Sequence, residues 1–594
     1  ILRCYQYFGK TINGTWSGII YTEGPDRSKH RLKFGDVIGR AVEAGRAEGV
    51  LGRQWPKRVF AAAHFTRADL AGFKDYSKFK CEFDAVRGTY TTIIDPYVYK
   101  FRDKQKHKRD LKIILRDTAV LSPNNSSLES LGELHGVEKI TLPEGAIERM
   151  DKLLTEDAAL FEGYAIRDAE IAAIHAWKMA EFSRDNGLKS EPPVTIGGLA
   201  TKLLLNLWDV NQISLNDVLG KEYIKKKLWN RSTRKYRTSK QMTDIAVVHN
   251  HSTLATEAYH GGRNEAYMFG FTKLDNWIDL DLGGAYSTAL SAIKTPDYRT
   301  TTVSTQVADY KKDCFGFAHL KFTFPDNTQY PCLPVRTDNG LIYPLTGETH
   351  VCSPEIELAV NLGAEIEIIH GIIIPWANNV RPFEIFSRTV REKRGELPKK
   401  SVFEQTWKEI GNSVYGKLAQ GLREKRAYDS RTEGSKSLPP SKITQPYLAA
   451  YTTSIIRAVL GELLARLPDS KTIVSATTDG FLSNANLDEV DTSGPLAQFF
   501  ADLTELMTSH RNILEVKHQN IPQVLCLKTR GQTTVGIKCA ETTTLLAKAG
   551  NKAPVAVLQM AEQSIKNDPD YTKPNDFKNI VENYWLLNTF IHRT

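Results

Sequence analysis

The stretch KEIGNSVYG, residues 408–416, constrains this 594-residue chain more than any other. It lies in the second of two helices that the sequence predicts over residues 382–421. Lys408, Asn412 and Tyr415 share one face of that helix, because their spacing is i, i+4, i+7. A cation, an amide and an aromatic ring side by side suit a triphosphate and the flat base attached to it. The alternative interpretation is a polar helix that ends at a glycine.

A second motif, VSATTDGFLS at residues 474–483, is typical of a strand, a tight turn and a second strand. It presents one carboxylate, Asp479, at the tip of a hairpin, two residues after Thr477. Taken alone, this pattern indicates an ordinary β-turn, in which Asp is a common residue. Its functional meaning depends on the rest of the chain.

The helical motif resembles the fingers motif of family-B DNA polymerases, which lies between two acidic palm elements. Upstream, DLGGAYSTAL (281–290) is similar to the first palm element. The resemblance implies that Asp281 binds metal and that Tyr286 lies under the sugar of the incoming nucleotide. Downstream, the hairpin stands where the family has an Asp-Thr-Asp turn, so Asp479 matches the second acid of that turn and Thr477 replaces the first.

The resemblance implies phosphoryl transfer with two Mg²⁺ ions, with Mn²⁺ also accepted. Two ions about 3.5–4 Å apart need carboxylates on both sides, and Asp281 and Asp479 would supply them from neighbouring strands. Asp279 lies on the same strand face as Asp281, because strand side chains alternate. Alignment to the family, rather than the pattern itself, selects Asp281. A dead site, indicated by Thr477, is the alternative.

Shorter matches follow in the family's order. YHGGR (259–263) is similar to the template-touching linker of protein-primed phage polymerases, and TTSIIR (452–457) to their template-contacting helix. LKTRG (527–531) stands near the primer end, and IKCA (537–540) resembles the same branch. REKR (391–394) offers triphosphate contacts or a solvated charged face. The residues implied are Tyr259, Gly261, Gly262, Arg263, Thr453, Arg457, Lys528 and Arg530 for DNA, and Arg391 and Arg394 for the nucleotide.

The N-terminal region resembles the 3′–5′ proofreading exonuclease of the same family. YAIRD (164–168) matches its Tyr-x-x-x-Asp motif. On a helix this spacing puts Tyr164 and Asp168 on one face, able to position a water and bind a metal.

AHFTRADLAGF (63–73) is similar to the second exonuclease motif, with Asp69 as the metal acid and His64 as a contact to the strand. Phe65 stands where the family has Asn. The first motif, Asp-x-Glu, is absent from residues 1–60. Either it precedes Ile1, as a chain that opens without Met suggests, or the nuclease is crippled.

Composition agrees with a polyanionic partner without requiring one. The net charge is +9, and residues 221–240 carry nine Lys or Arg against one Glu, interleaved with Tyr223, Trp229 and Tyr236. This favours either a nucleic-acid strip or a solvated charged face.

Seven scattered cysteines without CxxC spacing indicate reduced thiols in an intracellular protein. We see no apolar run of membrane-spanning length and expect no membrane partner.

The fold implied by the resemblance is α+β and multidomain: a ribonuclease-H-like 3′–5′ exonuclease domain followed by the palm, fingers and thumb of a right-hand polymerase. The predicted domains are the exonuclease at 1–190, the first palm part with the template-binding linker at 191–300, a palm insertion at 301–380, the fingers at 381–421, the second palm part at 422–510 and the thumb at 511–594.

The function implied is a template-directed DNA polymerase with proofreading, a monomer acting on template, primer or nascent strand, and dNTPs in the cytoplasm near the nucleoid. The Thr-Thr-Asp-Gly and Lys-Thr-Arg-Gly segments are most like the primer-independent family-B polymerases of mobile genetic elements. One alternative is a protein-primed polymerase of a phage or linear plasmid, which uses a terminal protein. The other is a non-catalytic DNA-binding protein on a degenerate polymerase scaffold.

Overall fold

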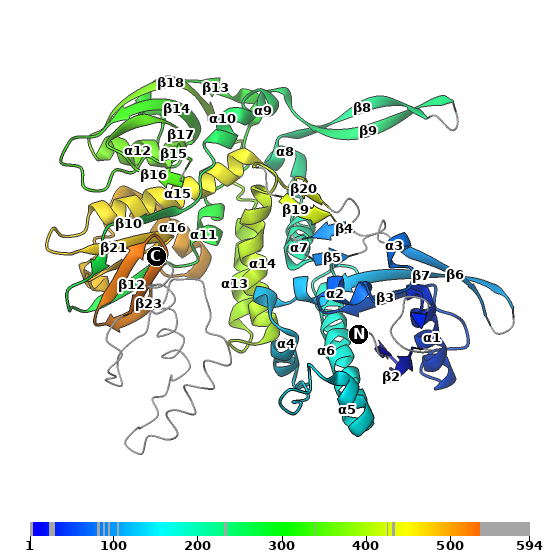
Figure 1. Ribbon diagram of the computed structural model, residues 1–594. Helices are drawn as coiled ribbons and strands as arrows, with labels where there is room; N and C mark the ends of the chain where they lie inside the picture. Colours follow the sequence, from blue (N-terminus) through cyan, green and yellow to red (C-terminus); the bar gives the residue numbers. More distant parts are fainter. Residues whose placement is uncertain are drawn as a thin grey trace, which may run out of the picture. The chain divides into compact units, whose positions relative to one another are not determined.

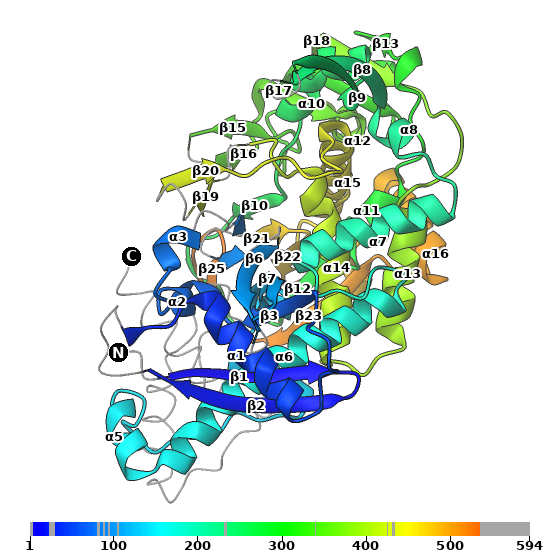
Figure 2. The ribbon, with the colours of Figure 1, turned by 90° about the vertical axis from the view of Figure 1, so that its right-hand side faces the viewer.

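The computed structural model describes residues 4–22, 30–79, 84–86, 90–92, 96–103, 106–230, 234–338, 340–423, 426–429 and 434–534. The chain forms two compact units (Figures 1 and 2), the first from residues 1–212 and 389–444 and the second from residues 213–388 and 445–594. The first unit therefore joins residues of the predicted exonuclease and fingers, and within it helix α7 (Ile196–Val210) packs against α14 (Val402–Leu418). The predicted domain boundary at residue 190 stays a prediction.

The first unit is built on a small mixed sheet and one long helix. Strand β7 (Lys108–Asp117) lies between β3 (Arg58–Ala63), to which it is parallel, and β6 (Tyr97–Arg102), to which it is antiparallel. Parallel strands end at the same edge, so the residues that follow β3 and β7 meet there. The core beneath the sheet contains Phe34, Val42, Leu70, Leu111, Ile113 and Leu115.

The remaining elements of the first unit surround this sheet. They are β1 (Cys4–Thr11), β2 (Gly14–Tyr21), α1 (Phe34–Ala47), α2 (Thr66–Leu70), α3 (Tyr76–Phe79), β4 (Asp84–Val86), β5 (Tyr90–Thr92), α4 (Leu128–His135), α5 (Met150–Glu156), α6 (Ala158–Asp185), β19 (Arg426–Asp429) and β20 (Gly434–Ser437).

Side-chain caps begin the two helices that matter most here. The Asp157 carboxylate accepts from the Leu160 amide at the start of α6, and the Ser401 hydroxyl accepts from the Glu404 amide at the start of α14. Each cap satisfies an amide that has no partner within its helix. The helix expected for Tyr164 and Asp168 is α6, and the helices predicted within 382–421 are also confirmed.

The second unit contains a five-stranded antiparallel sheet in the order β10-β21-β22-β12-β23. The strands are β10 (Arg263–Ala266), β21 (Ile473–Thr478), β22 (Gly480–Ser483), β12 (Trp277–Leu282) and β23 (Leu514–Ile521). The hairpin predicted at 474–483 is therefore β21 and β22. The strands on either side of this hairpin, β10 and β12, precede it by about 200 residues in the sequence. A core that includes Trp277, Val474, Leu482 and Ile521 holds the strands together.

Helix α15 (Pro446–Ala465) is the central helix of the second unit. It packs against α10 (Ser252–Glu257), α11 (Ala285–Ser291), α12 (Ser353–Asn361) and α16 (Pro495–Thr508). Within the described residues α15 alone has the length and hydropathy of a membrane span, contrary to the sequence prediction. Its most apolar window is 94% buried by the rest of the chain, as expected of a core helix.

A second sheet, in the order β13-β18-β14-β17, lies within the residues predicted as the palm insertion, 301–380. Of the predicted thumb, residues 511–534 are described and include β23 of the five-stranded sheet, whereas residues 535–594, with the 537–540 match, lie outside the described residues. The elements not yet named are α8 (Leu215–Leu219), β8 (Lys221–Asn230), β9 (Lys235–Asp244), α9 (Ala246–Asn250), β11 (Gly270–Phe271), β13 (Thr302–Val303), β14 (Phe315–Thr323), β15 (Val335–Thr337), β16 (Gly340–Ile342), β17 (Thr346–Cys352), β18 (Glu365–Ile374), α13 (Glu384–Gly395), β24 (Val524–Lys528) and β25 (Gly531–Thr534).

Candidate active site

Neighbouring strands of the five-stranded sheet bring Asp281 and Asp479 together. Asp281, in β12, lies opposite Gly480 in β22, and Asp479 directly precedes that glycine at the tip of the hairpin. The Leu282 amide donates to the carbonyl oxygen of Asp479 at 2.9 Å, which ties the tip to β12. Both acids line one pocket, whose other lining residues are Asp279, Thr477, Thr478, Lys517 and His518.

Gly480 leaves the space that the Asp281 carboxylate occupies. A Cβ atom on residue 480 would lie 1.9 Å from Oδ1 of Asp281 and 2.4 Å from the carbonyl oxygen of Leu280. Glycine is the residue that permits such a close approach. Any other residue at this position would displace the carboxylate or the strand beneath it, so Gly480 is part of the site.

The turn that carries Asp479 is strained. Thr478 has φ 62°, a left-handed conformation that is a genuine outlier for a β-branched residue. Nη2 of Arg530 donates to Oγ1 of Thr478 at 2.9 Å, and Nε of Arg530 donates to Oδ1 of Asn264 at 3.0 Å. Strain of this kind costs roughly 1–3 kcal/mol and persists only where surrounding contacts impose it. The Arg530 guanidinium therefore holds the turn, and its predicted contact with DNA stays a prediction. The Lys528 side chain lies outside the described part of the chain.

The geometry distinguishes Asp279 from Asp281. Asp279 is buried, and its Oδ2 lies 3.0 Å from Nδ1 of His518. Asp281 is only half-buried and lies beside the hairpin tip. This favours Asp281 as the acid that works with Asp479, the choice made from the family resemblance.

Lys517 is a neighbour of the acidic pair that the sequence analysis missed. Burial lowers the pKa of Lys517, but its hydrogen bond to Glu515 and the charges of Asp281 and Asp479 outweigh burial and raise it. The ammonium therefore stays charged and offsets part of the negative charge in the pocket. Spacing could not have identified Lys517, because its position depends on the pairing of β23 with β12.

Tyr286 lies one turn beyond the acid strand, in α11. Gly284, with φ 56°, turns the chain from β12 into that helix. Burial, aided by the charge of Asp479, raises the pKa of Tyr286 to about 12. The phenol is therefore neutral at physiological pH and close to the acidic pair. Its predicted position under a nucleotide sugar stays a prediction.

Carboxylate oxygens are the ligands that Mg²⁺ prefers in proteins. Across the described residues no three His, Cys, Asp or Glu side chains are gathered in a group able to hold a metal. Asp281 and Asp479 are therefore an open pair rather than a closed cage. Such a pair fits an ion that keeps several waters and is bound partly by substrate phosphates.

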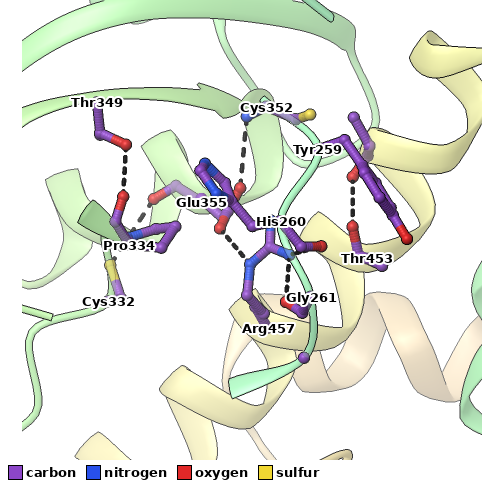
Figure 3. Close-up of polar contacts among 12 residues, drawn as sticks. Tyr259, His260, Gly261, Cys332, Pro334, Thr349, Cys352, Glu355, Thr453 and Arg457 are labelled. Carbon is purple, nitrogen blue, oxygen red and sulfur yellow. Dashed lines mark hydrogen bonds and ion pairs between the residues drawn. The ribbon is translucent and has the colours of Figure 1, made fainter. Parts of the chain in front are cut away.

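A buried ion pair holds the linker at residues 259–263 (Figure 3). Arg457 of α15 and Glu355 of α12 are both 0% exposed, and Nε of Arg457 lies 2.8 Å from Oε1 of Glu355. Nη1 of Arg457 also donates to the carbonyl oxygens of His260 at 2.9 Å and Gly261 at 2.8 Å. Through these two hydrogen bonds Arg457 fixes the path of the linker backbone from the buried side.

This arrangement corrects the predicted direct DNA contacts of Thr453 and Arg457. Both side chains are buried, because α15 is enclosed by other elements of its unit. The Thr453 hydroxyl donates to the Ala450 carbonyl oxygen at 3.1 Å within α15. In this structure Arg457 supports the linker, and neither side chain presents its polar group to a strand.

Arg263, at the end of the linker, is likewise buried. It pairs with Glu265, and its guanidinium lies 4.3 Å from the centroid of the Tyr343 ring. A Cβ on Gly262 would lie 2.7 Å from Cα of Thr478, so the linker runs tightly against the strained turn. Gly261 is exposed, as a backbone contact to template would require.

In the first unit, α14 has the surface that its sequence predicts. Lys408 and Asn412 are exposed and Tyr415 is half-buried, whereas the opposite face packs into the unit through Trp407, Ile410, Val414 and Leu418.

The two arginines of α13 that were predicted to contact the triphosphate, Arg391 and Arg394, are both half-buried. Nη2 of Arg394 lies 2.7 Å from Oε1 of Glu404, which holds this guanidinium against α14. Contact of either residue with a triphosphate stays a prediction.

Asp69, Asp117 and Asp168 of the first unit lie near the shared edge of β3 and β7, close enough to influence one another's charge but not grouped as a metal site. Asp69 lies in α2 directly after β3, Asp117 ends β7, and Asp168 lies on α6. Burial raises the pKa of Asp69 to about 6, and the charges of Asp117 and Asp168 add to this effect. Nζ of Lys139 lies 3.3 Å from Oδ2 of Asp168 and 5.0 Å from the Tyr164 ring centroid. Tyr164 and Asp168, the pair predicted on α6, therefore both contact Lys139, a residue that the sequence analysis missed.

Asp117, at the end of β7, is a structural acid. It is fully buried and accepts from the amides of Phe65 at 3.0 Å, Thr66 at 2.9 Å and Ala119 at 3.0 Å. These bonds hold Phe65 in a left-handed conformation, with φ 62°, at the start of the helix that carries Asp69.

His64 lies beside this buried cluster. Its Nδ1 is 3.1 Å from Oγ1 of Thr118, and burial lowers its pKa. The imidazole is therefore neutral at physiological pH, and its predicted contact with a DNA strand stays a prediction.

Comparison with known proteins relates the chain to DNA polymerases. Residues 195–455 match the family model for DNA polymerase type B, organellar and viral. A relative from Escherichia coli named primer-independent DNA polymerase PolB is 39% identical over 561 residues. The match takes in 90% of this chain but only 64% of that relative's length.

Solved structures of phi29 DNA polymerase share the multidomain fold. The ternary complex with primer-template DNA and incoming nucleotide has a TM-score of 0.57 at 11% identity, and covers 94% of this chain and 93% of that one. The complex with single-stranded DNA has a TM-score of 0.53 at 11% identity, and covers 92% and 88%. At this identity the similarity shows the fold alone.

Proposed function

The chain is related by sequence and by fold to the family-B DNA polymerases, and from this premise we propose that it is a template-directed DNA polymerase. It adds dNTPs to a 3′-hydroxyl at the pocket that contains Asp281 and Asp479. The observation that supports this most strongly is the placement of the two acids on paired strands, with Gly480 clearing the space between them. A protein that only binds DNA has no need of that clearance.

The residues of the pocket have separate parts in the proposed reaction. Asp281 and Asp479 would hold two Mg²⁺ ions, which when bound would lower the pKa of the 3′-hydroxyl and offset charge on the triphosphate. Lys517 balances the acidic pair before metal arrives. Tyr286, neutral at physiological pH, packs beneath the sugar and selects against a ribose 2′-hydroxyl.

The remaining predicted contacts complete the proposal. Lys408, Asn412 and Tyr415 hold the triphosphate and base of the incoming nucleotide. The exposed backbone at Gly261 follows the template, and Arg457 keeps that backbone in place. In this proposal α13 and α14 are the fingers and the five-stranded sheet is the palm.

We further propose initiation without a primer, since the relative from Escherichia coli is named for it. Initiation from a terminal protein is the alternative. The protein would work as a monomer inside the cell, near the nucleoid.

Incorporation of labelled dNTPs on a single-stranded circular DNA, with and without an annealed primer, tests both proposals. The account predicts product in Mg²⁺ or Mn²⁺ and none in EDTA. Product on the unprimed circle supports primer-independent initiation, and product only with a primer contradicts it. No product on either template, with DNA binding intact, favours the degenerate scaffold.

The first unit supports a second activity, removal of nucleotides from a 3′ end. In this proposal Asp69 and Asp168 would share a bound metal ion at one edge of a small sheet, and Tyr164, which lies with Lys139 beside Asp168, would position a water. Degradation of a 5′-labelled single strand tests it. Asp168→Asn is expected to abolish degradation, and Asp185→Asn, an exposed change on the same helix, to leave it intact. Equal rates in all three proteins would contradict the assignment.

A further inference from the structure

The hairpin of β8 and β9 is a ten-pair ribbon that contains the charged run at 221–240, for which the sequence left open a nucleic-acid strip or a solvated charged face. It forms a two-stranded sheet of its own and extends away from the helices at its base (Figure 1). Its aromatic side chains are exposed to solvent: Tyr236 is 70% exposed, Tyr223 59% and Trp229 51%. An isolated two-stranded ribbon is marginally stable in water, so three exposed aromatic rings on it call for an explanation.

The register places all three rings on one face. Cross-strand partners in an antiparallel pair share a face, and Trp229 pairs with Tyr236 while Tyr223 pairs with Met242. Trp229 and Tyr236 meet at the distal end, with ring centroids 4.9 Å apart. We call this side, with Lys225, Lys227 and Lys240 between the rings, the aromatic face.

The aromatic face is positively charged at its centre. Lys225 lies directly opposite Lys240, and like charges in that position destabilise a ribbon. The one acid of this face, Asp244, lies at the base of the hairpin, with Oδ1 2.8 Å from Nζ of Lys221. The hairpin therefore keeps repelling lysines where an anionic partner would relieve the repulsion.

The base of the hairpin is firmly attached to the second unit. The Tyr298 hydroxyl donates to the Val218 carbonyl oxygen at 3.1 Å, and the Gln445 side chain donates to the Leu219 carbonyl oxygen at 2.6 Å. Gly220, at φ 59°, has Val248 and Tyr298 within 3 Å of where a Cβ would be. A ribbon anchored in this way presents its face in a defined direction.

We propose that the aromatic face binds single-stranded DNA, with its lysines on phosphates and its rings stacked on bases. The run from Tyr223 to Trp229 spans about 20 Å at the rise of an extended strand, enough for several nucleotides. A single strand fits better than a duplex, because only unstacked bases offer their faces to Tyr and Trp rings. The binding site is separate from the Asp281–Asp479 pocket and does not depend on the proposed polymerase activity.

The first test compares two charge-matched variants. Binding of fluorescein-labelled (dT)₂₀ is measured by anisotropy in EDTA, without dNTPs, over a range of salt concentrations. Lys225→Ala/Lys227→Ala removes two charges from the aromatic face, and Lys226→Ala/Lys235→Ala removes two from the opposite face. Each phosphate contact with a single strand contributes about 0.7 to the slope of log binding constant against log salt concentration. Losing two contacts should therefore make this salt slope shallower by about 1.4 and weaken binding about 25-fold at 0.1 M salt. The control pair is expected to change affinity less than about threefold.

The second test removes the rings and leaves the charges. Trp229→Ala/Tyr236→Ala is expected to weaken (dT)₂₀ binding by about tenfold or more, with the salt slope unchanged. Equal weakening by the two lysine pairs, or unchanged affinity in the aromatic variant, would overturn the proposal. Because no nucleotide or metal is present, failure here and failure of the polymerase assay are distinguishable.

Discussion

Gly480→Ala tests the packing of the active site with the smallest available change. The added Cβ would lie 1.9 Å from Oδ1 of Asp281 and 2.4 Å from the Leu280 carbonyl oxygen. Non-bonded contacts below 3.0 Å are essentially never seen for Cβ atoms, so the carboxylate would have to move by about 1.1 Å. Rotation of Asp281 relieves the first contact but not the second, because the Leu280 oxygen belongs to the backbone of the paired strand.

The size of the effect follows from these displacements. A misplacement of about 1 Å at a catalytic group costs about 10²-fold in rate, and overpacking a core position costs roughly 1–3 kcal/mol in stability. We therefore expect Gly480→Ala to slow single-turnover dNTP incorporation about 10²-fold, with a melting temperature only a few degrees lower. Quench-flow primer extension and thermal unfolding measure the two quantities.

Gly52→Ala is the matched control. A Cβ at residue 52 has no atom within 4 Å, and its backbone suits any L-residue. This variant should keep the wild-type rate and stability. If Gly480→Ala also retained a rate within twofold of wild type, the described packing of Asp281 against the hairpin would be refuted.

Three further predictions follow from buried or strained groups. Glu355→Ala leaves the Arg457 guanidinium buried without its partner and is expected to cost about 3–5 kcal/mol, seen as a lower denaturation midpoint; an unchanged midpoint would contradict the buried pair. Burial lowers the pKa of His175 to about 3 from an ordinary value of 6.5, so its stabilisation is complete above pH 6.5 and decreases as pH falls, by about 2 kcal/mol at pH 5. His175→Gln should flatten the dependence of melting temperature on pH in that range, and a parallel dependence would refute this. Arg530→Ala releases the strained turn and is expected to lower the incorporation rate more than the affinity for DNA, whereas an equal loss of both would indicate a direct DNA contact instead.

Local patterns in the sequence predicted the elements that carry the site. The spacing of Lys408, Asn412 and Tyr415 gave one exposed helical face because a helix repeats every 3.6 residues. The turn residues around Asp479 gave a hairpin because their preferences are local. Both predictions depend only on neighbours along the chain, and both are confirmed in the fold.

Residues placed by long-range packing could not be predicted in the same way. Arg457 has the spacing of a DNA-contacting residue on a helix, but α15 is enclosed on all sides, and no local pattern shows which side of a helix meets solvent. Lys139 and Lys517 reach their acids through contacts between segments far apart in sequence. The charged run at 221–240 is open to two interpretations from its sequence, and only the strand register shows that its rings share one face.

The most direct test of the account is single-turnover dNTP incorporation on a primed template by Asp281→Asn and Asp479→Asn. Asp326→Asn, an exposed change in the same unit, is the control. Removing a ligand of the catalytic ions loses several kcal/mol of transition-state stabilisation, so we expect each active-site variant to be slower by about 10³-fold or more, with DNA binding and the control unchanged. A wild-type rate in either Asp281→Asn or Asp479→Asn would show that the paired strands do not form the catalytic site.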